Sequence, residues 1–225
     1  MSDSDDRGIR TYVLRTGRMT DAQRLALVEL WPRYGLDYDP ALRLDLRAAF
    51  GNERPVVAEI GFGMGAATWQ IAMANPETNY LGLEVHTPGI GKLLGELDSR
   101  DIENLRIVKH DAVEVFERAI EPNSFAGVHI FYPDPWPKKR HNKRRLIRDG
   151  LSALIASRIA PGGYLYFVTD IEDYALWSLD VLTRTPGLIN RYEGFAPHQE
   201  WRPETKFEHR AVREGRGAWE LIFDK

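Results

Sequence analysis

The sequence has no cysteine among its 225 residues. This absence excludes disulfide bonds, zinc sites built from thiolates and cysteine nucleophiles, and it agrees with a reducing compartment. Apolar runs of membrane-spanning length are also missing, and the polar, acidic first ten residues lack the apolar stretch of a signal peptide. We therefore expect a cytoplasmic protein without a membrane partner.

A large excess of charge of one sign is missing too. The chain carries 30 Lys and Arg residues against 33 Asp and Glu residues, which gives a formal net charge of −3. Binding to nucleic acid would therefore depend on local clustering of basic residues. The six histidines show no spacing typical of metal ligands, so the sequence predicts no metal site.

Two helices are expected near the N-terminus, within residues 20–50. Thr20 and Gln23 form a capping-box pattern that predicts the start of the first helix. Asp39 and Pro40 suit the N-cap and first turn of a second helix that ends near Phe50.

From residue 55, short apolar runs alternate with helical stretches, which predicts a mostly parallel sheet with helices on both faces. The last two runs, "LINRYEG" and "GAWELIFD", have no long helix between them and predict a C-terminal antiparallel hairpin. We expect an α/β, Rossmann-like, seven-stranded fold in which 19–225 is a single domain behind a flexible basic arm, 1–18. One helix is expected over 143–159, with Ile147, Leu151, Leu154 and Ile155 on one face.

A glycine-rich loop, "EIGFGMGAAT", follows the first strand of this core. Gly61, Gly63 and Gly65 permit a tight turn and a close approach of a ligand to the backbone. The loop alone is weakly specific, because Gly61, Gly63 and Ala66 also fit the dinucleotide pattern G-x-G-x-x-A, and a plain strand-to-helix turn would look similar.

Three acidic residues lie at successive strand ends beside this loop. Glu59 precedes the loop, Glu84 ends the second core strand and Asp111 follows the third. Ligands of open α/β sheets bind at the carboxyl edge, where Glu84 would bind ribose hydroxyls and Asp111 would lie beside an adenine ring. The pattern favours an adenosine-containing ligand. Three features indicate that this ligand is S-adenosylmethionine. An acid, Glu59, stands directly before the loop, and the loop has no lysine that would bind a phosphate. The chain also has little room for the second domain that nicotinamide enzymes generally need.

The segment "IFYPDPWPKKRHNKRR", residues 130–145, combines proline, an acid, an aromatic ring and dense positive charge. Its three prolines favour an extended chain in which Asp134 and Trp136 face the same side, an arrangement suited to recognising a base. The alternative is that Trp136 packs and Asp134 only makes a turn. Residues 138–148 contain no acid, which predicts contact with a phosphate backbone. Their basic residues are Lys138, Lys139, Arg140, Lys143, Arg144, Arg145 and Arg148.

The sequence resembles the bacterial tRNA (guanine-N7-)-methyltransferase family, of the TrmB type. The resemblance covers nearly the whole chain and rests on "RTYVLRTGRMTDAQ", "EIGFGMG", "LGLEVHTPGIG", "DPWPKKRHNKRR", "FVTD" and "TKFEHRAVREGRGAWEL". The proline-basic and T-x-F-E blocks are the most specific. Tyr132 and Asn142 stand where phenylalanine and histidine are more common, and neither replaces a functional side chain that the family implies.

The resemblance implies methyl transfer from S-adenosyl-L-methionine to N7 of a guanine in the variable loop of tRNA, without an obligatory protein partner. It places the cofactor at Glu59, Gly61, Gly63, Gly65, Glu84, Asp111, Ala112 and Asp134, with Asp134 also catalytic. The implied substrate-binding residues are Lys138, Asp170, Thr205, Lys206, Phe207 and Glu208. The implied RNA contacts are Arg140, His141, Asn142, Lys143, Arg144 and Arg145.

The chemistry of guanine agrees with these roles. N7 carries a free lone pair, so the reaction needs alignment more than a base, and we expect Asp134 to orient the base and stabilise the positive charge that methylation leaves on it. Asp170 or Glu208 would accept hydrogen bonds from guanine N1 and N2. Three alternatives stay open: an adenine amino-methyltransferase, a non-catalytic RNA-binding protein and, more distantly, a nicotinamide oxidoreductase. The arginines of residues 7–18 would fold over tRNA or form a solvated tail.

Overall fold

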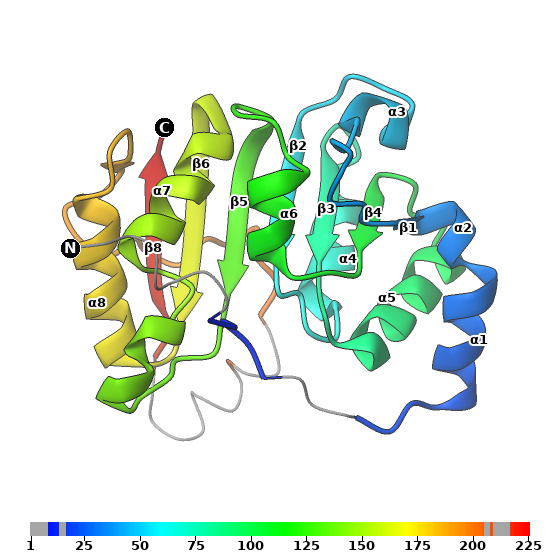
Figure 1. Cartoon of the computed structure of the whole chain (residues 1–225), viewed down its shortest axis with the longest axis horizontal. Helices are drawn as coiled ribbons and strands as arrows, with labels where there is room; N and C mark the ends of the chain where they lie inside the picture. Colours follow the sequence, from blue (N-terminus) through cyan, green and yellow to red (C-terminus); the bar gives the residue numbers. More distant parts are fainter. Residues whose placement is uncertain (1–8, 14–16, 205–207, 209–216) are drawn as a thin grey trace.

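The computed structural model describes residues 9–13, 17–204, 208 and 217–225. Its strands form one eight-stranded sheet in the order β1-β4-β3-β2-β5-β6-β8-β7. All pairings from β1 to β6 are parallel, and β8 runs antiparallel between β6 and β7 (Figure 1). The strands are β1 (Gly35–Leu36), β2 (Val56–Ile60), β3 (Asn79–Leu83), β4 (Leu105–Val108), β5 (Phe125–Phe131), β6 (Ile159–Thr169), β7 (Ile189–Asn190) and β8 (Trp219–Asp224).

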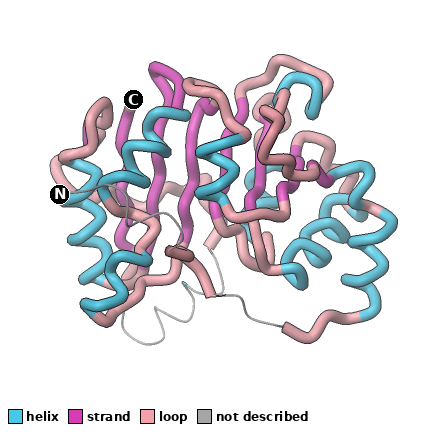
Figure 2. The backbone as a smooth tube through the Cα atoms, viewed as in Figure 1, coloured by secondary structure: helices cyan, strands magenta, loops and turns pink. Residues whose placement is uncertain are grey.

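Helices cover both faces of the sheet, as expected (Figure 2). The helices α6, α7 and α8 pack on one face, while α4 and α5 pack on the other, where α1 lies against α5. The helices are α1 (Asp21–Glu29), α2 (Trp31–Tyr34), α3 (Leu46–Phe50), α4 (Ala66–Ala74), α5 (Thr87–Ser99), α6 (Ala112–Arg118), α7 (Asp149–Arg158) and α8 (Glu172–Thr183), and a 3₁₀ turn spans Lys139–Arg144.

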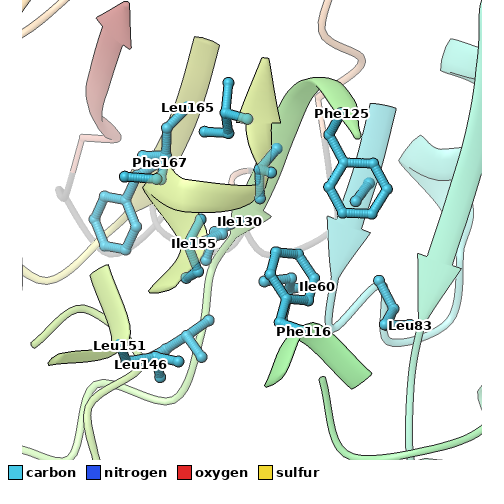
Figure 3. Close-up of a cluster of buried hydrophobic side chains, with 14 of the residues drawn as sticks. Ile60, Leu83, Phe116, Phe125, Ile130, Leu146, Leu151, Ile155, Leu165 and Phe167 are labelled. Carbon is cyan, nitrogen blue, oxygen red and sulfur yellow. The ribbon is translucent and has the colours of Figure 1, made fainter. Parts of the chain in front are cut away.

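Fully buried side chains of the strands pack against those of α6, α7 and α8 on one face of the sheet. Phe116 of α6 and Phe125 of β5 are fully buried with ring centroids 5.4 Å apart, and Ile155 of α7 is equally buried (Figure 3). Burial of each such side chain contributes roughly 1.5–3 kcal/mol. This packing holds the parallel strands in a fixed register, with Ile60 opposite Leu83, so the loops that follow β2 and β3 leave the same edge.

Several expectations about elements need correction. The second N-terminal helix does not begin at Asp39, whose carboxylate accepts from the Ala41 amide in a local turn; α3 begins at Leu46 with Asp45 as its N-cap. The helix expected over 143–159 begins only at Asp149. The eighth strand is the two-residue β1, which is too short to leave a periodic signal in the sequence. No helix in the described part of the chain is long and apolar enough to span a bilayer.

Candidate active site

The glycine loop after β2 leaves its backbone open to a ligand. Gly61, Gly63 and Gly65 all have positive φ, of 77°, 59° and 70°, which favours glycine. A Cβ on Gly61 or Gly63 would meet no atom within 4 Å, whereas one on Gly65 would lie 2.8 Å from Leu93 Cδ1. The first two glycines therefore form a free cradle, and the third permits α4 to pack against α5.

Glu59 lies under this loop as the fourth residue of β2. It is 4% exposed, and burial raises the pKa of its carboxyl to about 7. The Thr68 hydroxyl opposes the rise in pKa, and the nearby Glu84 carboxylate adds to it. Among the described residues, only Thr68 and Glu84 act on this pKa through their side chains. Such a buried carboxyl suits the binding of a positively charged ligand group, which would favour its ionised form.

The Glu84 carboxylate is fixed by the backbone around it. Its Oε2 accepts from the Gly63 amide at 2.7 Å, and its Oε1 accepts from the amides of Val85 and His86 at 2.6 and 2.9 Å. Glu84 thereby ties the glycine loop to the loop after β3. Oε2 keeps a lone pair with which it can accept from a ligand hydroxyl.

Asp111 caps α6 and faces a large cavity. Its carboxylate accepts from the Val113 amide at 2.9 Å, and Ala112 is the first residue of α6. Burial raises the pKa of Asp111, and the Val113 hydrogen bond opposes the rise. The cavity of about 900 Å³ runs along Val85, Asp111 and Val113 and is closed on one side by Ile9, Arg10 and Tyr12.

Residues 10–12 of the expected flexible arm lie against the basic segment (Figure 1). The flexibility of the arm stays a prediction. Trp136 Nε1 donates to the Thr11 carbonyl at 3.0 Å. Arg144 donates to the carbonyls of Arg10 and Tyr12 at 3.0 and 3.1 Å. Of the other arginines of the expected arm, Arg18 is described, and Arg7 and Arg15 lie outside the described residues.

Trp136 does not adopt the extended conformation that the prolines predicted. Its φ is +45°, in the left-handed region that bulky side chains rarely enter, and the Arg144 guanidinium lies 3.8 Å from its ring centroid. The ring is therefore covered by an arginine and is no open platform for a base. The packing alternative fits Trp136 better in this arrangement.

Asp134 and Asp170 leave the same edge from neighbouring strands. Asp134 follows β5, Asp170 follows β6, and both are half-buried. Tyr132 begins the turn to Asp134 with a φ of +52° and donates its amide to Val168 of β6 at 2.8 Å. The edge thus brings both acids toward the glycine loop, which leaves β2 on the other side of β5.

The basic segment after Asp134 divides into exposed and internal residues. Lys138, Lys139, Arg140 and Lys143 are exposed, and His141, Asn142 and Arg144 are half-buried. Arg145 is 1% exposed; it donates to the Pro135 carbonyl at 3.0 Å, pairs with Asp173, and lies over the Tyr174 ring. The Arg145 guanidinium thus holds the Asp134 loop against α8 in this structure. The RNA contact expected of Arg145 stays a prediction and would require it to leave these partners.

Glu208 is also internal. It is 7% exposed, and both of its carboxylate oxygens accept from the Arg202 guanidinium. Thr205, Lys206 and Phe207 lie outside the described residues. His198, Glu208 and Glu220 bring ligand-type atoms within 4.8 Å of one another, but Arg202 donates to both carboxylates. The absence of a metal stays a prediction.

Comparison with known proteins decides the family. A family model described as a putative methyltransferase matches residues 53–221. A tRNA (guanine-N(7)-)-methyltransferase from an Acidovorax species is 54% identical over 219 residues, covering 97% of this chain and 87% of that protein. A protein of the same name from Thiobacillus denitrificans is 52% identical, with 96% and 94% covered. This chain belongs to the tRNA (guanine-N7-)-methyltransferase family.

Solved structures confirm the expected class of fold for this family member. The 16S rRNA methyltransferase KamB matches with a TM-score of 0.56 and 14% identity, covering 92% of this chain and 94% of that chain. The antibiotic-resistance methyltransferase Kmr matches with a TM-score of 0.56 and 15% identity, covering 84% and 93%. At such identities the similarity shows the fold alone. The Rossmann-like methyltransferase fold is confirmed. The nicotinamide oxidoreductase alternative is wrong because the chain belongs to a methyltransferase family.

One residue of the methyltransferase site escaped the sequence reasoning. Gly89 of α5 packs so closely on the glycine loop that a Cβ would lie 1.8 Å from the Gly63 carbonyl oxygen. Its φ is ordinary, so only the contact in space reveals the need for glycine. The sequence carries a glycine there, in "HTPGIG", but no local rule connects it to residue 63.

We expect Gly89→Ala to weaken S-adenosylmethionine binding by at least about tenfold and to lower the Tm, because the new methyl group must displace the Gly63 backbone. Isothermal titration calorimetry and thermal unfolding measure the two effects. The matched control is Gly95→Ala in the same helix, where a Cβ meets nothing within 4 Å; it should raise stability by roughly 0.5–1 kcal/mol without changing affinity. Equal affinities for the two variants would contradict the account.

Proposed function

We propose that this protein transfers the methyl group of S-adenosyl-L-methionine to N7 of a guanine in the variable loop of tRNA, giving 7-methylguanosine. The observation that carries the proposal is one edge of the sheet where an open glycine cradle with buried acids lies beside an exposed basic segment. Family membership supports the same reaction. Methylation of unmodified tRNA, with identification of the methylated nucleoside, tests it.

The residues present fit S-adenosylmethionine. The cradle at Gly61 and Gly63 leaves room that a ligand would fill, and Glu59 offers a buried carboxyl for a cationic amino group. Glu84 would accept from the ribose hydroxyls. Asp111, which lines the cavity, and the next residue, Ala112, would lie beside the adenine. When bound, the sulfonium cofactor supplies an electrophilic methyl carbon.

The protein's own residues would orient the guanine and stabilise the charge that forms. N7 attacks through a lone pair, so no proton has to leave first. The carboxylate of Asp134 would orient the purine and stabilise its positive charge after methylation. Asp170 and Glu208 would accept from N1 and N2, which adenine cannot satisfy because its corresponding edge lacks that pair of donors. No step in this scheme requires a metal or a second protein. We also assign the protein to the cytoplasm, where it would meet the proposed tRNA substrate.

The exposed cations would bind the phosphate backbone. We assign this role to Lys138, Lys139, Arg140 and Lys143, with His141 and Asn142 at the edge of the same surface. Arg144 would contact RNA only after it releases the carbonyls of residues 10 and 12. Arg10 and Tyr12, which line the cavity beside Asp111, would border the adenine end of the cofactor site. Residues 19–225 would form a single catalytic domain.

Replacing Lys138 and Lys139 with alanine is expected to weaken tRNA binding by about tenfold at moderate salt. The slope of log Kd against log salt concentration should fall by about 0.7–0.9 for each phosphate that the variant no longer neutralises. Affinity for S-adenosylmethionine should stay unchanged. The matched control removes two charges near the amino ends of the strands, Arg47 and Arg54. An equal loss in both double variants would show that only net charge matters and would remove the assigned RNA surface.

A further inference from the structure

A buried ion cluster centred on Arg202 joins the neighbouring strands β6 and β8 beside the active site. The side chain of Arg202 is 0% exposed. Its Nε donates to the Tyr166 hydroxyl at 3.0 Å, and its two terminal nitrogens donate to Glu208 at 2.8 and 2.5 Å and to Glu220 at 2.8 Å. Tyr166 belongs to β6 and Glu220 to β8, so one guanidinium joins both strands to Glu208.

The cluster has a second layer of contacts that fixes Glu220. The Tyr166 hydroxyl donates to Glu220 Oε2, and His198 Nδ1 lies 2.8 Å from Glu220 Oε1. Burial alone would lower the pKa of Arg202, but its hydrogen bonds to Glu208 and Glu220 raise that pKa above the ordinary value. Arg202 therefore stays charged, and Nε and both terminal nitrogens each donate to an acceptor.

The cluster also reaches the start of the Asp134 loop. Burial raises the pKa of the Tyr132 hydroxyl. The nearby Arg202 guanidinium lowers that pKa, and the nearby Glu208 carboxylate raises it further. Tyr132 has a φ of +52° and is two residues before Asp134. A strained backbone conformation in a bulky residue persists only where its surroundings hold it. The same cluster thus touches the turn that aims Asp134 and the acid assigned to guanine.

Stability alone is a weak reason for such a cluster. Removing one guanidinium and two carboxylates from water costs free energy that their mutual attraction often does not offset. Proteins in which apolar side chains replace such a cluster are frequently as stable as the original. Such clusters fix geometry better than they add stability, because a bidentate arginine sets both the distance and the plane of its carboxylate. Arg202 therefore fixes both the position and the plane of the Glu208 carboxylate.

We propose that Arg202 is a positioning residue for guanine recognition: it sets the Glu208 carboxylate, braced by Glu220 and Tyr166, against the guanine N1–N2 edge. This inference rests on the proposed function. Arg202 touches no reacting atom; it acts through Glu208 and through the Tyr132 turn.

The test compares Arg202→Lys, Glu208→Gln and the double variant on tRNA carrying guanosine or inosine at the target position. Inosine keeps N7 but lacks the N2 amino group. The intact protein should prefer guanosine by about tenfold or more in kcat/KM. Arg202→Lys keeps the charge but loses the fork, so the preference should fall below about threefold, as in Glu208→Gln. The double variant should lose little beyond Glu208→Gln.

Affinity for S-adenosylmethionine should stay within twofold in Arg202→Lys, which separates positioning from general damage to the fold. The matched control is Arg191→Lys, an arginine on the same hairpin that pairs with Asp224 and is half-exposed; it should keep the full preference. If Arg202→Lys does not fold, Tyr166→Phe removes only the hydroxyl that braces Arg202 and Glu220, and it should lower the preference by at least about threefold.

The inference is overturned if folded Arg202→Lys keeps the preference for guanosine over inosine. It is also overturned if the double variant loses the product of the two single losses, which would show that Arg202 and Glu208 act independently. A loss of cofactor affinity equal to the loss of activity would also overturn it. Failure of the intact protein to methylate any tRNA guanine is a different result, because it contradicts the proposed function before any variant is compared.

Discussion

Replacing Glu59 with glutamine is expected to weaken S-adenosylmethionine binding about 100-fold at pH 8 and, in the free protein, to raise stability at the same pH. Both effects follow from one buried carboxyl, whose pKa is raised to about 7 by burial. The cationic amino group of the ligand would pair with the ionised form, and glutamine offers no charge to pair with.

The sign of the stability change follows from linkage. The pKa of Glu59 is raised in the folded state from an ordinary value of 4.5. Its contribution to stability is therefore fully present below pH 4.5 and is lost as the pH rises through 7. At pH 8 the ionised carboxyl costs roughly 3 kcal/mol in the free protein, which glutamine would recover. Glu59→Gln should consequently flatten the fall in stability between pH 5 and about 8.

Calorimetry and thermal unfolding across this pH range measure both effects. In the unchanged protein, affinity should fall about tenfold for each pH unit below 7, because the carboxyl must lose its proton to bind the cation. In Glu59→Gln this dependence should vanish. Glu77→Gln, at an exposed surface pair with Arg54, is the control and should change neither property. An unchanged cofactor affinity in Glu59→Gln would contradict the assigned role.

Asp134→Asn is expected to slow methyl transfer in a single turnover by about 100-fold or more. Asparagine keeps the shape and an acceptor oxygen but removes the negative charge that would stabilise the methylated purine. Because N7 needs no deprotonation, Asp134 is not required as a base in this step. Saturating cofactor and tRNA separate the chemical step from binding.

Asp149→Asn is the control for Asp134→Asn. Asp149 is an exposed acid at the start of α7 that pairs with Arg184, away from the glycine loop. It should leave the rate unchanged. Full turnover by Asp134→Asn would show that the negative charge at this position is not needed, and the catalytic assignment would then be wrong.

Local patterns predicted those elements whose cause is local. Thr20 and Gln23 form the reciprocal capping box that their spacing indicated. The last two apolar runs have no long helical pattern between them in the sequence, which indicated the hairpin, and β7 and β8 pair antiparallel as expected. Asp39 misled because aspartate caps a turn with the same hydrogen bonds that it uses to cap a helix.

The sequence predicted which residues gather at the site better than it predicted which of them are exposed. Gly61 and Gly63 could be placed from the sequence because positive φ after a strand has few other solutions. Arg145 and Arg144 could not be told apart from their neighbours, because one is buried by α8 and the other is engaged by residues 10–12. The role of Arg202 was not predicted, since two of its partners, Tyr166 and Glu220, come from strands that are distant in the sequence.

The most direct test of the central claim is methyl transfer from labelled S-adenosylmethionine to an unmodified tRNA transcript, followed by mass spectrometry of the nucleosides. The account predicts 7-methylguanosine, and it predicts that the product disappears when the variable-loop guanine is changed to adenine. A different methylated nucleoside, or 7-methylguanosine that survives that change, would contradict the proposed reaction or its position.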